Sequence, residues 1–458
     1  MRQLHLVASL AVASGLCLLG PVGCSDDNSP GVSAEAAPVT LLMLRHDNQS
    51  YSKADDEAFA DYKLTHPNVS VMATNVDWFT WVTRLNADLP RDQYPFDLIL
   101  MPPSVTCGFA DHLSDVPADA VDLAQAQNTF FSAPLSGSVC NGVLKGLPIE
   151  YNLEYGGVVV NLDRYQAKYP GMRPAWKTWD EFLKQASELS EFDPVTGKAC
   201  TNGLDIDPDW PEPVRHIFLS QILQRGGDYW SARKDNTFDF NTAEARASLA
   251  AMASWVTVNK VMSVNLVPDK NTLVTTRMAK GATGYGCGGP GQPLSTMGYV
   301  GTWGLPDILN QVPAGTTTHY EYFGLPPMVG EQHKFVQNSG FAFAVPKSSK
   351  NQKAAWDLIK AIALSPDVMR KWTATAGTLP ALRANGTAAA AMSDPQLAKV
   401  QPLLEHGQWM GYIPSASTEP VLGAMVSNFF AVVKGTKTID VALADMEKKA
   451  NEAIIQFR

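Results

Sequence analysis

The chain has 458 residues, a formal net charge of −9, and 45% hydrophobic against 18% charged residues. This balance is typical of a globular protein with a mildly acidic surface, and no basic stripe is present to neutralise phosphates, so nucleic acid is not expected as a partner. The length beyond the N-terminal segment suffices for two or three domains.

A secretory signal peptide is predicted at residues 1–23. Arg2 supplies a charged start, residues 6–19 form a short apolar core, and small residues follow it. The apolar run is shorter than the roughly 20 residues that a transmembrane helix needs. We therefore expect the segment to be removed during export.

The residues around Cys24 indicate a lipid anchor. Val22, Gly23 and Cys24, followed by polar residues, resemble the bacterial lipoprotein box, although Pro21 stands where that pattern usually has leucine. The alternative is an ordinary signal cleaved nearby, with Cys24 left as a thiol. Residues 24–38 are rich in Ser, Asp, Ala and Pro, which predicts a flexible tether. The protein is expected in the periplasm or at the cell surface, attached to the membrane through Cys24.

The remaining cysteines predict two disulfides. Loss of the signal and lipidation of Cys24 leave four: Cys107, Cys140, Cys200 and Cys287. An even number in an exported protein favours disulfides, and none shows the close spacing of a zinc site. Three pairings are possible, of which we expect Cys107 with Cys140 and Cys200 with Cys287.

Beyond the tether, short apolar runs alternate with amphipathic ones. Strands are predicted at 39–44, 69–73 and 97–101, and helices at 54–64 and 79–89. Buried strands separated by helices indicate a parallel sheet covered on both faces. This first region is expected to be α/β.

A second α/β region with a helix-rich C-terminal third is predicted after residue 150. Thr178 is expected to cap a helix, because Asp180 and Glu181 follow in the first turn. Strands are predicted at 156–161 and 341–345, and further helices at 212–224, 242–259, 351–364, 421–433 and 439–455.

Four segments share an order that is typical of one family. They are Gly146 to Pro148 with Tyr151 and Asn152; Thr178 to Phe182; Gly340 to Asn351 with Ala354 to Ile359; and Gly377 to Pro380. Together they resemble the extracellular solute-binding proteins of sugar ABC transporters, family 1, the maltose-binding-protein-like group. The resemblance implies an α/β, two-lobe periplasmic-binding-protein-like fold of type II, with a ligand cleft between lobes.

The resemblance also implies discontinuous domains. The chain would cross between lobes near Ile149, Gly330 and Gly377. The N-terminal lobe would then comprise residues 39–149 plus 331–376, and the C-terminal lobe residues 150–330 plus 377–458. Hinge closure around a ligand is the expected motion.

A sugar needs flat aromatic side chains for its ring faces and planar polar groups for its hydroxyls. Candidates for ligand binding follow predicted strands or lie in loops: Asp47, Asn48, Trp78, Ser104, Glu150, Tyr151, Trp210, Trp230, Tyr285, Trp303, Asn338, Trp409 and Tyr412. Trp210 and Tyr285 resemble family positions that face the sugar. The alternative for each aromatic is half-buried packing, and for each polar residue a helix cap or turn. Trp356 is expected in the core.

The sequence predicts a monomeric protein that captures a carbohydrate, of oligosaccharide size, and delivers it to the permease subunits of an ABC transporter. No catalytic residues, cofactor or metal are expected: Glu150 and Glu154, in one strand, would lie about 13 Å apart, beyond glycosidase geometry. Alternatives are a binding protein for another polar solute that feeds a sensor or chemoreceptor, or a carbohydrate-active enzyme. Scarce acidic clusters argue against polyamines and metal ions.

Overall fold

The protein is described by a computed structural model that covers residues 37–91, 94–154, 156–206, 211–232, 237–263, 274–279, 293–315, 317–331, 333–337, 340–383, 400–409 and 419–456. The predicted signal peptide and most of the predicted tether, with Cys24, lie outside the described residues.

Five strands form the first sheet. Their order is β2 (Val69–Val76), β1 (Val39–His46), β3 (Leu98–Met101), β14 (Ala342–Ala344) and β6 (Leu147–Pro148). β1 is parallel to β2 and β3, as predicted, but β14 is antiparallel to β3 and β6, so the sheet is mixed. A βαβ connection makes the two strands that it joins parallel. No such connection joins β14 to its neighbours, because the chain returns to β14 from a distant segment, so β14 can pair in the antiparallel direction.

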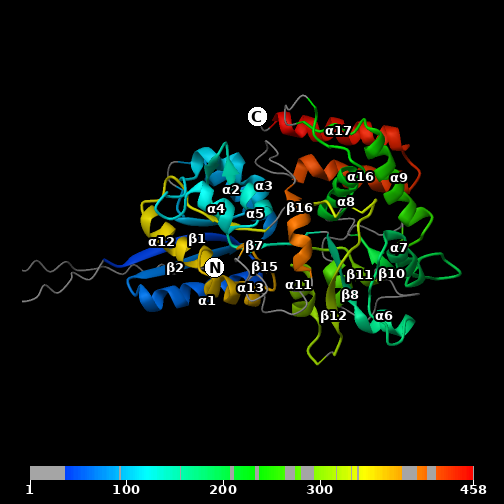
Figure 1. Cartoon of the computed structure of the whole chain (residues 1–458), viewed down its shortest axis with the longest axis horizontal. Helices are drawn as coiled ribbons and strands as arrows, with labels where there is room; N and C mark the ends of the chain where they lie inside the picture. Colours follow the sequence, from blue (N-terminus) through cyan, green and yellow to red (C-terminus); the bar gives the residue numbers. More distant parts are fainter. Residues whose placement is uncertain are drawn as a thin grey trace, which may run out of the picture. The chain divides into compact units, whose positions relative to one another are not determined.

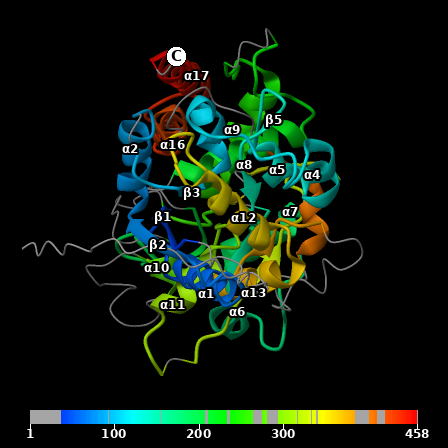
Figure 2. The ribbon, with the colours of Figure 1, turned by 90° about the vertical axis from the view of Figure 1, so that its left-hand side faces the viewer.

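Long helices flank this sheet: α1 (Gln49–Thr65), α2 (Trp78–Asp88), α12 (Gln352–Ala363) and α13 (Pro366–Ala376). Figures 1 and 2 both show α1, α12 and α13 beside β1 and β2, although α12 and α13 follow them by some 300 residues of sequence. Trp356 on α12 is 4% exposed, which confirms its predicted core position. We call this sheet and its helices the first lobe.

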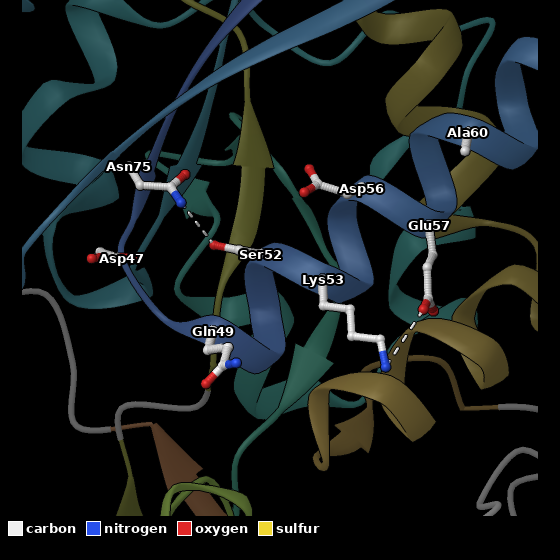
Figure 3. Close-up of a pocket in the computed structure, with 8 residues that line it drawn as sticks. All are labelled: Asp47, Gln49, Ser52, Lys53, Asp56, Glu57, Ala60 and Asn75. Atoms are coloured by element: carbon white, nitrogen blue, oxygen red, sulfur yellow. Dashed lines mark hydrogen bonds and ion pairs between the residues drawn. The ribbon is translucent and has the colours of Figure 1, made fainter. Parts of the chain in front are cut away.

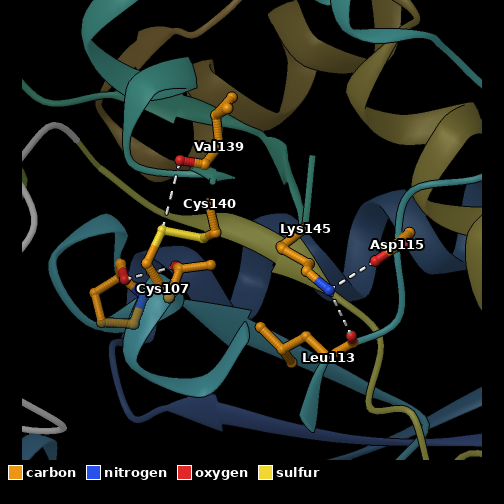
Figure 4. The surroundings of a disulfide bond; sticks show 8 residues. Cys107, Leu113, Asp115, Val139, Cys140 and Lys145 are labelled. Carbon is orange, nitrogen blue, oxygen red and sulfur yellow. Dashed lines mark hydrogen bonds and ion pairs between the residues drawn. A yellow bond between two sulfur atoms is a disulfide. The ribbon is translucent and has the colours of Figure 1, made fainter. Parts of the chain in front are cut away.

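The connection from β3 to β6 contains only short elements: α3 (Pro103–Thr106), η1 (Cys107–His112), α4 (Leu123–Thr129), α5 (Ser132–Ser136), β4 (Val139–Cys140) and β5 (Val143–Leu144). The Cys107–Cys140 disulfide joins η1 to β4 across 33 residues, which is the expected pairing (Figure 4). Cys200 is also disulfide-bonded. Its expected partner, Cys287, lies outside the described residues.

Five strands form the second sheet, in the order β12 (Tyr320–Gly324), β8 (Gly157–Asn161), β11 (Leu294–Gly298), β10 (Ala199–Asp205) and β9 (Glu191–Phe192). Only β10 and β11 are parallel, so this sheet is mixed as well. Valine fills the centre of β8, and all five β8 residues are buried because helices or other strands cover both faces.

The helices of the second sheet are α6 (Leu162–Lys168), α7 (Trp179–Glu188), α8 (Pro211–Gln224), α9 (Ala243–Thr257), α10 (Val274–Ala279), α11 (Gly304–Gln311), α16 (Glu419–Val433) and α17 (Ile439–Gln456). Thr178 caps α7, as predicted: its hydroxyl accepts a hydrogen bond from the Glu181 N–H at 3.2 Å. Figure 1 shows α16 and α17 beside α8 and α9. We call this sheet and its helices the second lobe.

A buried ion pair fastens α10 to the second sheet. Arg277 on α10 donates from Nε and Nη2 to the two carboxylate oxygens of Asp205, at 2.8 and 2.9 Å. Asp205, the last residue of β10, is fully buried and Arg277 is 3% exposed. Ser295 donates a further hydrogen bond to the same carboxylate. The bidentate geometry offsets the cost of removing both charges from water.

The chain passes between the two sheets three times: from β6 to β8, from β12 to β14, and from α13 to α16. On the first and third passages, β7 (Glu150–Tyr151) pairs antiparallel with β15 (Leu379–Pro380). Between the second and third, β13 (Phe335–Gln337) pairs parallel with β16 (Gly407–Trp409), which follows η2 (Gln401–His406). The passages therefore hold one another together through backbone hydrogen bonds.

The expected strand that carried both Glu150 and Glu154 is wrong, because β7 ends at Tyr151. The backbone N–H of Leu153 donates to the Thr302 hydroxyl at 3.2 Å instead of to a neighbouring strand. The Thr302 N–H in turn donates to the carbonyl of Leu153. After β7, hydrogen bonds with Thr302 therefore take the place of hydrogen bonds to a neighbouring strand.

Among the helices that the structure describes, none combines the length and the apolar character needed to cross a bilayer.

Candidate functional site

One cavity, of about 560 Å³, lies along one side of α1 in the first lobe (Figure 3). Its lining is polar and contains no aromatic ring: Asp47, Gln49, Ser52, Lys53, Asp56, Glu57, Ala60 and Asn75. Three of the charged groups already have partners, because Lys53 lies 3.9 Å from Glu57, and Asp56 lies 2.9 Å from Arg45. This lining offers no flat surface for a sugar ring.

A second cavity, of about 510 Å³, lies in the second lobe among α6, α11 and β12. Two ion pairs occupy its walls: His319 with Asp163 at 3.0 Å, and Arg173 with Glu321. Each of the two cavities is lined by one lobe alone, so neither corresponds to a site between lobes.

Asp47 and Asn48 follow β1, as predicted, but only Asp47 is exposed to solvent along the first cavity. Asn48 is the N-cap of α1, where its side-chain oxygen accepts a hydrogen bond from the Tyr51 N–H at 3.1 Å. That oxygen satisfies one of the otherwise unpaired amides of the first helical turn. The capping alternative therefore accounts for Asn48.

Replacing Asn48 with alanine is expected to lower the free energy of unfolding by about 1 kcal/mol, because the α1 cap is lost. Replacement with serine, which also caps helices, should retain most of that stability. Urea denaturation of both variants measures the difference. Equal destabilisation by alanine and serine would contradict a capping role.

Two further candidates are packed inside a lobe. Ser104 on α3 is 3% exposed. Trp230 lies flat against Phe238, with ring centroids 4.6 Å apart and planes 14° apart, and it packs on the second-lobe core. Phe238 therefore covers one face of Trp230, which is the packing arrangement named as the alternative.

Glu150 and Tyr151 lie on the first passage between the sheets, and both are fully buried. The Tyr151 hydroxyl donates to the carbonyl of Leu404 at 2.7 Å and accepts from the Gln337 side chain. Glu150 accepts from the backbone N–H of Phe341 at 2.9 Å. Both side chains therefore connect passages to one another.

Glu154, three residues after Tyr151 on the first passage, belongs to a group of side chains that the sequence did not indicate as a site. Glu154 faces His216 on α8, with Oε2 and Nε2 3.6 Å apart and side chains 7% and 0% exposed. Trp303, a predicted candidate, is half-buried at the start of α11. A methyl group built on Gly301 would lie 2.6 Å from the Trp303 indole nitrogen and 3.3 Å from Glu154 Cγ. The backbone of Gly301 therefore lies between the Trp303 indole and the Glu154 side chain, and there is no room for a larger residue at this position.

This group combines an aromatic ring with polar side chains, which is the chemistry that a sugar requires. The sequence suggests a role for Glu154 only as the second carboxylate of a catalytic pair with Glu150. His216 had no motif around it. Their proximity comes from the packing of α8 against the first passage, which no sequence spacing reports.

Burial dominates the electrostatics at the edge of the first lobe. It raises the pKa of Glu150 to about 7, although hydrogen bonds from Tyr51 and the Phe341 N–H act in the opposite direction. Burial also raises the pKa of Asp55 to about 6, although the positive charge of the neighbouring Arg45 lowers it. Desolvation lowers the pKa of His46 to about 4, and the charges of Asp47 and Asp77 oppose that shift.

The other candidates lie outside the described residues, wholly or in their side chains. Trp210, Tyr285, Asn338 and Tyr412 are not described, and only the backbone of Trp78 and Trp409 is. Trp78 begins α2. Trp409 ends β16, and its backbone is in register with Gln337, the last residue of β13.

Metal binding was not expected, and the described part of the chain contains no cluster of three or more His, Cys, Asp or Glu residues with metal-binding geometry. His319 and Asp163 form a pair without a third ligand of this kind.

Comparison with known proteins bears on the chain as a whole. The sequence profile of the family described as "Bacterial extracellular solute-binding protein" matches residues 57–399. No curated protein sequence matches significantly.

Solved structures with the same fold include three binding proteins from bacteria. The sugar-binding protein MalE of Xanthomonas citri is 18% identical, with a TM-score of 0.68 over 91% of this chain and 98% of that chain. The cyclic alpha-maltosyl-1,6-maltose binding protein of Arthrobacter globiformis is 18% identical, with a TM-score of 0.70 over 92% and 100%. MalE of Bdellovibrio bacteriovorus, bound to maltotriose, is 15% identical, with a TM-score of 0.68 over 91% and 100%.

Proposed function

Because the chain belongs to the bacterial extracellular solute-binding protein family, we propose that it captures an oligosaccharide between its two lobes and delivers it to an ABC permease. The observation that carries the proposal is the similarity of the two-lobe fold to that of the cyclic alpha-maltosyl-1,6-maltose binding protein. The structural match covers 92% of this chain and 100% of that protein's chain. Contacts to both lobes favour closure, since only the closed form makes both sets at once.

Trp303 and Glu154 are the described residues that we assign to the ligand on the second lobe. The indole would stack on a sugar ring and the Glu154 carboxylate would bond its hydroxyls, while the fully buried imidazole of His216, 3.6 Å from that carboxylate, would orient it. The undescribed candidates Trp210 and Tyr285 complete the assignment: Trp210 directly precedes α8, which carries His216, and Tyr285 follows α10.

We assign no chemistry to this site. The matched family and the similar structures consist of binding proteins. Glycoside cleavage needs two carboxylates on either side of the bond. Glu150 is fully buried among the passages between lobes, so its carboxylate is not placed beside a substrate.

Family membership implies export. We propose that lipidation of Cys24 then anchors a monomer to the membrane, and that the tether lets the lobes reach the permease. Labelling with radioactive palmitate, compared between the full chain and its Cys24→Ser variant, tests the anchor. Label that persists in the variant would rule it out.

A thermal-shift screen tests the proposed ligand class. Maltotriose at about 100 times its Kd should add about 2.7 kcal/mol to the free energy of unfolding, because a ligand that binds only the folded state stabilises it. Glucose, spermidine and Mg²⁺ serve as comparisons and should give smaller shifts. A panel of maltose, maltotriose and cyclic maltooligosaccharides that leaves the melting temperature unchanged would reject oligosaccharides of this type.

A further inference from the structure

The side chain of Asn152 connects segments that belong to both lobes. Its amide nitrogen donates to the Tyr51 hydroxyl on α1 at 3.3 Å. Its oxygen accepts from the Thr302 hydroxyl, just before α11 in the second lobe, at 3.2 Å. The same oxygen accepts from Thr378, on the third passage, at 2.8 Å. Asn152 is 3% exposed, so these bonds form away from water.

Glu150 extends the same network to the remaining passage. Its Oε1 accepts from Asn152 at 3.2 Å and from the backbone N–H of Phe341, on the second passage, at 2.9 Å. Gly340 permits this approach: it has φ +80°, and a methyl group built on it would lie 2.8 Å from Glu150 Cγ. We call Glu150, Asn152, Tyr51, Thr302, Thr378 and the backbone of Phe341 the hinge junction.

All three passages and one residue of each lobe therefore meet at the hinge junction. A rotation of one lobe about the passages changes the dihedral angles of these segments. The hydrogen bonds of Glu150 and Asn152 must then lengthen or exchange. The free energy of the junction consequently contributes to the choice between lobe arrangements.

We propose that Glu150 is a positioning residue whose proton helps to set the arrangement of the two lobes. Protonated, Glu150 is a neutral group that suits its buried place in the hinge junction. Ionised, it favours any arrangement that lets water reach the carboxylate. Solution pH is thereby linked to hinge position.

Burial outweighs the hydrogen bonds from Tyr51, the Phe341 N–H and Thr378, which favour the ionised form of Glu150, so the surroundings favour the neutral form on balance. Burial raises its pKa to about 7, and the negative charge of Asp55 on α1 acts in the same direction. Asp55 is itself paired with Arg45, and it accepts a hydrogen bond from Trp372 on α13. Tyr51 on α1 is a further titratable neighbour of Glu150, and the charges of Glu150 and Glu154 both act on its hydroxyl. No cation pairs with Glu150 in the described part of the chain.

The direction of the linkage follows from this raised pKa. Below pH 4.5, Glu150 is protonated in every arrangement and contributes no preference. As the pH rises from 4.5 to about 7, the buried arrangement loses stability relative to one in which the pKa is closer to its ordinary value, and above about 7 the difference is constant. For each unit by which the pKa differs between two arrangements, their population ratio changes up to tenfold.

Spin labels on Lys63→Cys in α1 and Lys448→Cys in α17, both exposed positions, report the separation of the lobes. We expect the distribution of label distances in the ligand-free protein to change between pH 5.5 and 8.5. The Glu150→Gln variant, which keeps the shape of the side chain without its titration, should not show the change. The Asn152→Ala variant should lose it too, because the link to Thr302 is broken.

The exposed Glu331 supplies a matched control: Glu331→Gln should retain the response of the unsubstituted protein. A wild-type distribution that does not depend on pH overturns the proposal, and so does an unchanged response in Glu150→Gln. The proposal rests on the proposed function only in that the lobes move. Since no ligand is present, failure to bind an oligosaccharide leaves this test unaffected.

Discussion

Replacing Trp303 with alanine is expected to reduce affinity for maltotriose by about 30- to 1,000-fold. Truncation of a central tryptophan in a binding site costs roughly 2–4 kcal/mol, and each 1.4 kcal/mol corresponds to a factor of ten in Kd. The half-buried indole loses its stacking surface, whereas the helix that follows it, α11, keeps its backbone hydrogen bonds. Isothermal titration calorimetry measures the change.

Trp176 provides the comparison for this substitution. It is another half-buried tryptophan of the second lobe, and it packs edge-on against Phe182 with ring centroids 4.9 Å apart. Trp176→Ala should lower stability but leave the maltotriose Kd unchanged under conditions where both variants are folded. If both substitutions weaken binding equally, Trp303 has no particular place at the ligand.

Replacing Arg277 with methionine is expected to lower the free energy of unfolding by roughly 3–5 kcal/mol. Methionine keeps the apolar stem of the side chain, but the substitution leaves the fully buried Asp205 carboxylate without its cation, and an uncompensated buried charge is costly. Urea denaturation followed by circular dichroism measures the loss. We expect the transition of the second lobe to shift most, because α10 is bonded to the second sheet through this pair.

The double variant Asp205→Asn with Arg277→Met separates charge burial from packing. It removes the charge that the single variant leaves behind, so it should be more stable than Arg277→Met alone. A double variant that is less stable than the single one would show that the geometry of the pair, rather than charge compensation, decides the stability.

Local features of the sequence predicted local features of the fold. Thr178 caps α7 because its hydroxyl and the acidic residues after it act within one helical turn. The strands and helices of the first lobe lie close to their predicted positions, since hydrophobic periodicity over ten residues reports which face is buried. The even number of cysteines predicts disulfides but leaves three pairings open, and the pairing of Cys107 with Cys140 is the one expected if each bond lies within one lobe.

Long-range features were not predictable in this way. β14 lies antiparallel in the first sheet because the chain returns to it from the second lobe, and strand direction leaves no mark in a sequence of three apolar residues. Glu154 and His216 are 62 positions apart, and Asp205 and Arg277 are 72 apart. No local pattern records such pairs. The sequence predicted what kinds of residue a sugar site needs, but not which of them face one another.

The disulfide between η1 and β4 has a consequence for how the protein should be produced. The connection from β3 to β6 contains strands of two residues and helices of at most seven, so few backbone ladders hold it in place without the covalent link. A chain made in a reducing cytosol lacks that link, since thiols are kept reduced there. Its β3–β6 connection would then be the first target of proteases, and recombinant material secreted into an oxidising medium should survive digestion longest.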